Sequence, residues 1–529
     1  MDRFNILIVD DEIDQVEHYA AMCADYEHAK VFTATRPEDA RKLIESTFFH
    51  LALVDLEFQN EAIGADILAF LADYRPTCEC ILITRRPAEY QTDILKLLDP
   101  LRRLAHAIVD KRNWRPILKE YLSDKVDRWA RSPVQVESLT DILDAIASKP
   151  FRSRVKVTQD EVDHLLSSLH GQGQFLDRND FEVSSISTSC MTGGRSNSIV
   201  LKCQPKTSHQ MNGIWTVVKL SPRADAVEEY LRYSRYVRFL VSLDARVELL
   251  GYVSGDTLGA ICYSFAGKTP NVVQGLNDLF EDSDERASIV LNRLFAPEAQ
   301  CWYATSGKVV AIPDFLDRAY GLKTEDVIHA VEETVQKTQS KLVGIELRNG
   351  GLVWNGIKLP DPLQTLGSAK MSKRYKSCII HGDMNASNII TAEDGRAIMI
   401  DYRHTTVGPR ALDFAALETA IRLTSTKSNS PIDEILKTFR LEAAAWKTNW
   451  ASSNRFPQND RDATYWQKIS SQLTALARMN FQDLTPLEYA CTCFGWIARM
   501  LRVPLPFEQR LRLVCWMSHL SQVIEGHNN

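Results

Sequence analysis

The sequence predicts two folded modules: an N-terminal α/β domain with a parallel sheet, then an α+β domain with a strand-rich lobe and a helical lobe. Residues 1–111 contain short apolar runs separated by longer amphipathic stretches, which is the pattern of βα units. Residues 181–265 contain strand patterns joined by turns, and most of the chain beyond them has helical periodicity. A length of 529 residues also favours more than one domain.

The composition excludes several classes of protein. Hydrophobic residues make up 45% and charged residues 25% of the chain, as in ordinary globular proteins. A formal charge of −6 gives no general attraction to nucleic acid or to an anionic membrane. No apolar run has the length of a membrane span, and the N-terminus enters a strand pattern with no secretory signal. We therefore expect a cytoplasmic protein whose 11 cysteines are reduced.

In the N-terminal module, polar residues follow each of four apolar runs. The runs are Ile6–Val9, Leu51–Val54, Cys80–Ile83 and Ala107–Val109. Functional groups of a parallel sheet collect beyond the carboxyl ends of its strands. The residues collected there are Asp10, Asp11, Asp55, Thr84 and Lys111.

This set resembles the receiver domain of bacterial response regulators, which have a flavodoxin-like, five-stranded parallel sheet. The resemblance implies that Asp55 accepts a phosphoryl group and that Asp10 and Asp11 hold Mg²⁺. It also implies that Lys111 pairs with the phosphate and that Thr84 is the switch hydroxyl. The alternative is the same fold with an idle acidic rim, but five matching positions in order argue against it.

Two positions depart from the receiver pattern. Ile108 stands where an aromatic switch residue is usual, and Arg112 stands where a Pro usually follows the Lys. These two positions depart from the usual aromatic relay, and docking is an alternative role for this domain.

Residues 112–171 have the pattern of linking helices. Helical spacing runs from Trp114 to Trp129 and from Leu139 to Ala147, and Thr158 to Glu161 resembles a capping box that begins a third helix.

The strand-rich lobe carries candidate phosphate-binding groups. A hairpin with Gly193 and Gly194 at its tip would let backbone N–H groups approach phosphates. Lys219 lies near the end of the next strand, and the following helix offers Glu228 and Glu229 as its ion-pair partner. We prefer Glu228, although the sequence does not separate the two.

The stretch from Cys378 to Asp413 carries the chemistry of phosphoryl transfer. An apolar run ends in His381-Gly-Asp383, Asn388 follows five residues later, and a second apolar run ends at Asp401. Asp394-Gly395 between the runs favours a hairpin turn. Phosphoryl transfer needs a carboxylate that orients the hydroxyl and hard oxygen ligands for Mg²⁺. The alternative, a plain turn with two helix caps, does not explain the register of Asn388 with Asp401.

The order H-G-D-x-x-x-x-N followed by I-D resembles the aminoglycoside phosphotransferase and choline kinase branch of the protein-kinase-like fold. The resemblance implies that Asp383 is the catalytic base and that Asn388 and Asp401 ligate Mg²⁺. Lys219 would contact the phosphates of ATP. His381 and Asp413 would be structural, with Asp413 bracing the catalytic loop. The chain is also similar to the kinase-like ternary complex associated domains. We expect a receiver domain over residues 1–125, a helical linker over 126–177, a kinase-like N-lobe over 178–268 and a helical C-lobe over 269–529.

The sequence therefore predicts a bacterial two-component signalling protein in which a phosphorylatable receiver is coupled to an ATP- and Mg²⁺-dependent phosphotransferase. The expected partners are a sensor histidine kinase or another phosphodonor, ATP, an acceptor with a hydroxyl group and partner proteins. The main alternative is a catalytically silent, nucleotide-binding module that recruits a partner. Nucleotidyl transfer, and a receiver attached to a mere scaffold, remain further alternatives.

Overall fold

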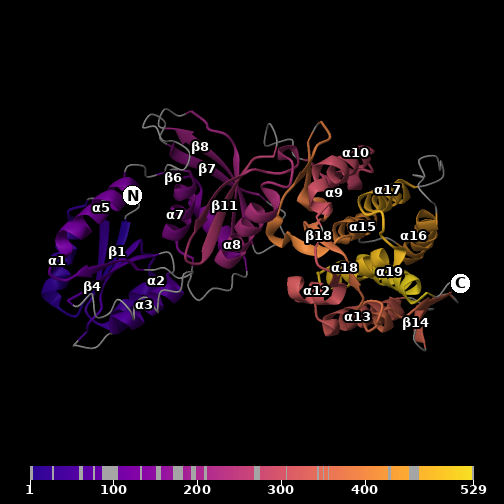
Figure 1. Cartoon of the computed structure of the whole chain (residues 1–529), viewed down its shortest axis with the longest axis horizontal. Coiled ribbons are helices and arrows are strands. Elements are labelled where there is room, and N and C mark those ends of the chain that lie inside the picture. The colour runs from indigo at the N-terminus through magenta and orange to yellow at the C-terminus, as the bar shows by residue number, and fades with distance from the viewer. Residues whose placement is uncertain are drawn as a thin grey trace. The chain divides into compact units, whose positions relative to one another are not determined.

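The computed structural model divides the chain into two compact units, and each is described by itself (Figure 1). Unit 1 comprises Met1–Tyr230 with Leu249–Phe265, and unit 2 comprises Leu231–Glu248 with Ala266–Asn529. The residues that the structure describes are 4–26, 29–58, 63–75, 78–85, 105–130, 134–149, 157–170, 183–191, 198–207, 211–266, 274–305, 307–341, 345–348, 351–354, 357–392, 394–426, 431–451 and 464–526.

Unit 1 begins with a five-stranded parallel sheet in the order β2-β1-β3-β4-β5. The strands are β1 (Phe4–Val9), β2 (Ala29–Ala34), β3 (Leu51–Asp55), β4 (Glu79–Thr84) and β5 (Ala105–Asp110). This is the flavodoxin-like strand order, so the predicted fold class of the first module is confirmed.

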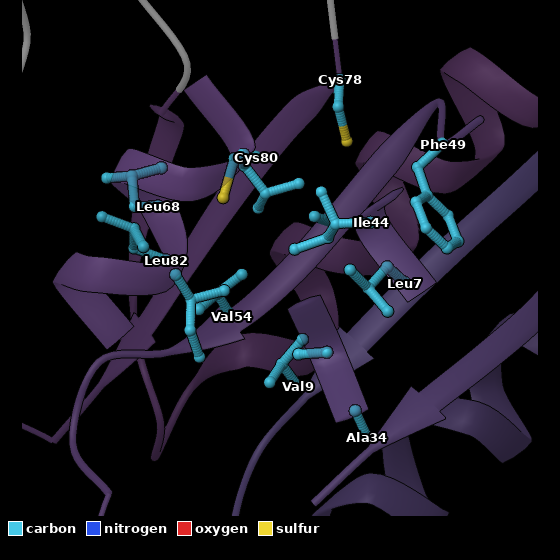
Figure 2. Packing of buried hydrophobic residues seen from close by; sticks show 14 of the residues in the cluster. Leu7, Val9, Ala34, Ile44, Phe49, Val54, Leu68, Cys78, Cys80 and Leu82 are labelled. Carbon is cyan, nitrogen blue, oxygen red and sulfur yellow. The ribbon is translucent and has the colours of Figure 1, made fainter. Parts of the chain in front are cut away.

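Helices cover both faces of this sheet (Figure 1). They are α1 (Ile13–Ala24), α2 (Pro37–Ser46), α3 (Ile63–Tyr74) and α5 (Trp114–Ala130). Successive side chains of a strand point to opposite faces. Ile6 and Ile8 therefore pack with α1 and α5, whereas Leu7 and Val9 pack with α2 and α3. Figure 2 shows this second cluster, in which Leu7 lies near Ile44 of α2 and Val9 lies near Ala34 of β2. Burial on both faces explains why these strands are continuous apolar runs.

A second sheet of unit 1 has six strands in the order β10-β11-β9-β8-β7-β6. The strands are β6 (Gln135–Val136), β7 (Val183–Met191), β8 (Ile199–Thr207), β9 (Thr216–Pro222), β10 (Leu249–Ser254) and β11 (Leu258–Ser264). All neighbouring pairs are antiparallel except β6 with β7, which is parallel. This sheet is the strand-rich lobe that the sequence predicted.

The segment expected to be a helical linker is part of this lobe. Strand β6 extends the sheet, and α6 (Leu139–Ala147) and α7 (Gln159–His170) bury their apolar faces in the same core as β7, β8, β9 and β11. The physical reason is the apolar stripe of α7, formed by Val162, Leu165, Leu166 and Leu169, which the sheet covers. The described part of the predicted helical linker therefore packs into the core of the second sheet, and its predicted helices are present.

Helix α7 also contacts the parallel-sheet domain. Asn5 Nδ2 lies 3.3 Å from Asp160 Oδ2, and the rings of His50 and His164 are 5.5 Å apart in an edge-to-face arrangement. Arg75 Nη1 forms an ion pair with Asp256 Oδ2 at 3.2 Å, and neither side chain has exposed surface. Asp256 lies between β10 and β11, so the two sheets of unit 1 share a buried polar contact.

Unit 2 is mainly helical in its described residues. Its helices are α9 (Leu276–Glu281), α10 (Arg286–Arg293), α11 (Gln300–Tyr303), α12 (Ile312–Tyr320), α13 (Thr324–Lys341), α14 (Pro362–Leu366), α15 (Leu412–Thr424), α16 (Ile432–Ala451), α17 (Tyr465–Asn480), α18 (Pro486–Met500) and α19 (Phe507–Glu525). Trp302, Trp496 and Trp516 are among its largest fully buried side chains. The helical lobe that the sequence predicted is therefore present in the described residues of this unit. Within the described residues, every helix falls short of the length and apolar character that crossing a membrane requires.

Short strands of unit 2 form small sheets of two or three strands. They are β12 (Gln274–Gly275), β13 (Val310–Ala311), β14 (Ile345–Arg348), β15 (Gly351–Trp354), β16 (Ile357–Pro360), β17 (Arg374–Tyr375), β18 (Ser377–Ile380), β19 (Ile389–Thr391), β20 (Ala397–Met399) and β21 (Thr406–Pro409). Antiparallel pairing of β19 with β20 and of β18 with β21 frames residues 381–405.

Candidate functional site

An acidic cluster lies at the carboxyl ends of β1 and β3. These strands are neighbours in the sheet, so Asp10 and Asp11 after β1 meet Asp55 at the end of β3. One carboxylate oxygen from each of the three lies within 4.8 Å of the others. Three converging carboxylates provide the hard oxygen ligands that Mg²⁺ prefers. The donor set therefore fits a divalent cation.

Lys111 neutralises this cluster from the end of β5. Its Nζ lies 2.9 Å from Asp10 Oδ2 and 2.9 Å from Asp55 Oδ2. Its backbone N–H donates to the carbonyl of Thr84, whose side chain is buried at the end of β4. The structure thus brings all five residues predicted from this module to one edge of the sheet.

Burial controls the protonation of this cluster. It raises the pKa of Asp55 to about 6, because the hydrogen bond from Lys111 offsets only part of the cost of desolvating the carboxylate. Burial also raises the pKa of Asp10 for the same reason. A cation bound between these carboxylates would favour their ionised forms.

In the second sheet of unit 1, Lys219 forms a buried ion pair. Its Nζ lies 2.7 Å from Glu229 Oε2, and Tyr263 Oη donates to Glu229 Oε1 at 2.9 Å. We preferred Glu228 as the ion-pair partner of Lys219, and this prediction is wrong because the partner is Glu229. Glu229 lies on the buried face of α8 (Arg223–Arg232) with Ala226, whereas Glu228 is exposed. Gly193 and Gly194 lie outside the described residues.

The catalytic-loop candidate of unit 2 is held by a buried carboxylate. Asp413, in the first turn of α15, accepts hydrogen bonds from the N–H of His381 at 2.8 Å and of Gly382 at 3.1 Å. Tyr303 Oη donates to Asp413 as well, at 3.0 Å. Gly382 has a φ of +79°, and a Cβ there would clash with the carbonyl of His404. Only glycine satisfies both demands at this position.

The loop brings Asp383 and Asn388 together, and Asp401 follows the hairpin that begins after Asn388. Asn388 Nδ2 donates to the carbonyl of Asp383 at 2.8 Å and lies 3.3 Å from Asp383 Oδ2. Asn388 and Ile400 are linked across the base of the β19–β20 hairpin by a backbone hydrogen bond of 3.0 Å. Asp401 follows directly, with a left-handed φ of 63°. His381 Nε2 lies 2.9 Å from the carbonyl of Ile400, so the histidine ties the loop to the hairpin.

One residue near this loop escaped the sequence analysis. Arg499 Nη2, on α18, lies 3.2 Å from Asp383 Oδ1. No spacing rule links the two residues, because they belong to segments far apart in the chain. Helical spacing does place Trp496 and Arg499 on one face of α18, but that signal does not identify their partner.

Parts of the chain are similar to known proteins. Residues 317–454 match the family model described as "Ternary complex associated domain 9". A response regulator receiver domain protein (CheY-like) from Methanospirillum hungatei is 26% identical, with a TM-score of 0.21, over 25% of this chain and 98% of that chain. No curated protein is similar enough to match.

Two further solved structures are similar to the larger part of the chain. A putative aminoglycoside phosphotransferase from Ralstonia eutropha is 10% identical, with a TM-score of 0.36, over 69% of this chain and 99% of that chain. An ethanolamine kinase from Plasmodium vivax is 11% identical, with a TM-score of 0.31, over 74% of this chain and 96% of that chain. TM-scores this low do not define a fold, which rests on the strand orders and contacts described above.

The chain thus combines a flavodoxin-like parallel-sheet domain that carries the acidic Asp10, Asp11 and Asp55 cluster with a second, mostly antiparallel sheet and a mainly helical unit that holds the braced loop of Asp383.

Proposed function

We propose that this chain is a signalling phosphotransferase that moves the γ-phosphoryl group of ATP to a hydroxyl group, under the control of its receiver domain. The observation that carries the proposal is the braced loop of unit 2. Asp413 fixes the backbone of residues 381–382, and Asp383 stands beside Asn388 at the base of the hairpin that ends at Asp401.

In this proposal Asp383 is the general base. It takes the proton of the acceptor hydroxyl as that oxygen bonds to the γ-phosphorus. The bond between the γ-phosphorus and the bridging oxygen breaks, and its electron pair leaves on ADP. Asn388 and Asp401 would hold Mg²⁺, which neutralises the phosphate charge when bound.

The strand-rich lobe of unit 1 would hold the nucleotide. The Lys219–Glu229 ion pair supports a role for Lys219 on the phosphates, because the glutamate fixes the direction of a long, flexible side chain. Gly193 and Gly194 would add backbone N–H groups to the same phosphates.

The receiver would act through Asp55. A phosphodonor, such as a histidine kinase, would transfer its phosphoryl group to the Asp55 carboxylate, with Asp10 and Asp11 holding Mg²⁺. Lys111, now paired with both Asp10 and Asp55, would then pair with the new phosphate, and Thr84 would follow it.

Labelled ATP tests the phosphotransferase. We expect transfer or hydrolytic release of the γ-label and no incorporation of an α-label. Asp383→Ala should lower turnover by at least about 100-fold and leave nucleotide affinity nearly unchanged, because a general base contributes to the transition state and not to ATP binding.

The matched control is Asp394→Ala, which removes an exposed carboxylate from the hairpin turn. It should keep full turnover. Incorporation of the α-label would instead mean nucleotidyl transfer, and nucleotide binding without any turnover would mean the catalytically silent, partner-recruiting module.

A further inference from the structure

Arg499 is held beside Asp383 in a corner formed by two aromatic rings. Its guanidinium lies 4.4 Å from the ring centroid of Tyr320 and 4.3 Å from that of Trp496. The two rings are nearly perpendicular, at 84°. Contacts of this kind fix a guanidinium by cation–π attraction, so Arg499 has little freedom to leave Asp383.

Two features of the fold position these aromatic rings. Gly495 lets α18 approach α12 closely, because a Cβ there would clash with Ile312 and Leu316 of α12. Tyr320, the last residue of α12, donates its hydroxyl hydrogen to the carbonyl of Gly382. The corner is therefore joined directly to the loop that carries Asp383. Helix α18 lies outside the part of the chain that matches the family model.

The corner is already filled by a cation. Two neighbouring aromatic rings beside a carboxylate would otherwise suit an ammonium group. Here the guanidinium of Arg499 lies against both rings and against the carboxylate. A cationic acceptor would have to displace it or remain next to a like charge, and both cost binding energy.

Arg499 also keeps donors for a ligand. Nη2 contacts Asp383, while Nη1, within the described part of the chain, contacts the thioether sulfur of Met500 at 3.6 Å. A thioether is a weak acceptor, so hydrogen-bonding capacity remains on a side chain that is 18% exposed. A planar guanidinium with unused N–H groups is suited to a carboxylate or a phosphate.

We propose that Arg499 selects the acceptor, and that the acceptor is a hydroxyl compound with an anionic group close to the reacting hydroxyl. The proposal rests on the phosphotransferase function proposed above. The reacting hydroxyl of the acceptor donates a hydrogen bond to Asp383. Arg499, which forms an ion pair with Asp383, binds the carboxylate or phosphate of the same acceptor molecule. Acceptors that carry an ammonium group are disfavoured by the positive charge of Arg499.

Three small acceptors of similar size and different charge test this proposal: glycerate, glycerol and ethanolamine. Transfer of the γ-label of ATP to each is measured as kcat/KM. We expect glycerate to exceed glycerol and ethanolamine by at least about tenfold in the wild-type chain. Arg499→Gln should lower kcat/KM for glycerate by at least about tenfold more than it lowers kcat/KM for glycerol, because only glycerate loses a partner for its carboxylate. Arg499→Lys keeps the positive charge but lacks the planar, forked N–H donors of arginine. Its kcat/KM for glycerate should lie between those of the wild type and Arg499→Gln.

The control variant is Arg510→Gln, which removes an arginine of α19 that pairs with Glu333 of α13. It should keep the wild-type order of kcat/KM among the three acceptors. The proposal is overturned if ethanolamine is the best acceptor. It is also overturned if Arg499→Gln reduces all transfers and ATP hydrolysis equally, or if the wild type hydrolyses ATP without transferring label to glycerate. An absence of all ATP turnover in the wild type would instead refute the proposed function itself.

Discussion

At the scale of single residues, Asp413 lies in the first turn of α15 with no exposed surface. Burial raises the pKa of its carboxyl group, while the hydrogen bonds from the loop N–H groups oppose that rise. Its side chain satisfies two backbone donors that would otherwise be buried without an acceptor. The position of Asp383 therefore depends on a residue that has no part in the proposed chemistry.

We predict that Asp413→Ala weakens the loop more than it weakens the fold. Two buried N–H groups lose their acceptor, at a cost of about 1–3 kcal/mol each. Amide hydrogen exchange at His381 and Gly382 should become faster, and turnover should fall at least about tenfold with little change in nucleotide affinity. Asp483→Ala, which removes an exposed ion-pairing carboxylate of unit 2, is the control. Unchanged exchange at both amides would show that Asp413 does not brace the loop.

Sequence alone located most candidate residues but could not choose among neighbours. Asp383, Asn388 and Asp401 follow from local spacing, because a loop and a two-stranded hairpin fix their relative positions. To choose Glu229 over Glu228, one must know which face of α8 is buried. The three-residue spacing of Glu229 from the buried Ala226 was the available signal, since that spacing places both on one helix face. Arg499 had no local signal, because its partner comes from a different part of the fold.

At the scale of secondary-structure elements, α7 begins as the sequence suggests but uses its glutamate differently. Thr158 Oγ1 accepts the N–H of Glu161 at 3.2 Å, which is half of a capping box. The carboxylate of Glu161 accepts the N–H groups of Thr257 at 2.6 Å and of Leu258 at 3.0 Å. A predicted helix cap is thus also a long-range contact between α7 and the β10–β11 turn, which no local pattern contains.

The buried carboxyl of Glu161 should make stability depend on pH. Burial, followed by the charge of Asp256, raises the pKa of Glu161 from 4.5 to about 7. The folded state therefore holds a proton that the unfolded state releases, and stability falls as pH rises from about 4.5 to about 7. A pKa difference of this size corresponds to about 3 kcal/mol at most.

Glu161→Gln tests this effect, because the amide oxygen can still accept both N–H groups but does not ionise. We expect the variant to lose less stability than the wild type between pH 5.5 and 7.5, measured by urea unfolding. Burial lowers the pKa of His164 to about 4, and this histidine contributes equally to the slope of both proteins, so the difference between the two slopes reports on Glu161. Glu17→Gln, an exposed change on α1, should keep the wild-type slope. Equal slopes for the wild type and Glu161→Gln would refute the assignment.

At the scale of the whole molecule, the sequence predicted which modules are present and their order, because each carries its own strand pattern and polar residues. It did not predict the contact between the two sheets of unit 1. Arg75 follows α3, donates to the carbonyls of Ile44 and Glu45, and forms an ion pair with Asp256. This contact lies near the amino ends of the parallel strands, whereas Asp55 lies at a carboxyl end. A signal from Asp55 to the second sheet would therefore have to cross the parallel-sheet domain.

We predict that this contact carries the receiver signal. Treatment of the wild type with a small phosphodonor such as acetyl phosphate should change ATP turnover by at least about threefold, and Asp55→Asn should abolish the change.

The combined variant Arg75→Met with Asp256→Asn removes both charges together, which avoids the cost of a single unpaired buried charge. It should accept phosphate at Asp55 as the wild type does but lose most of the response, because the buried link between the sheets is gone. Arg36→Met, which removes an exposed arginine of the same domain, is the control and should respond normally. A full response in the combined variant would show that the signal takes another route, and the absence of any response in the wild type would show that the two modules work independently.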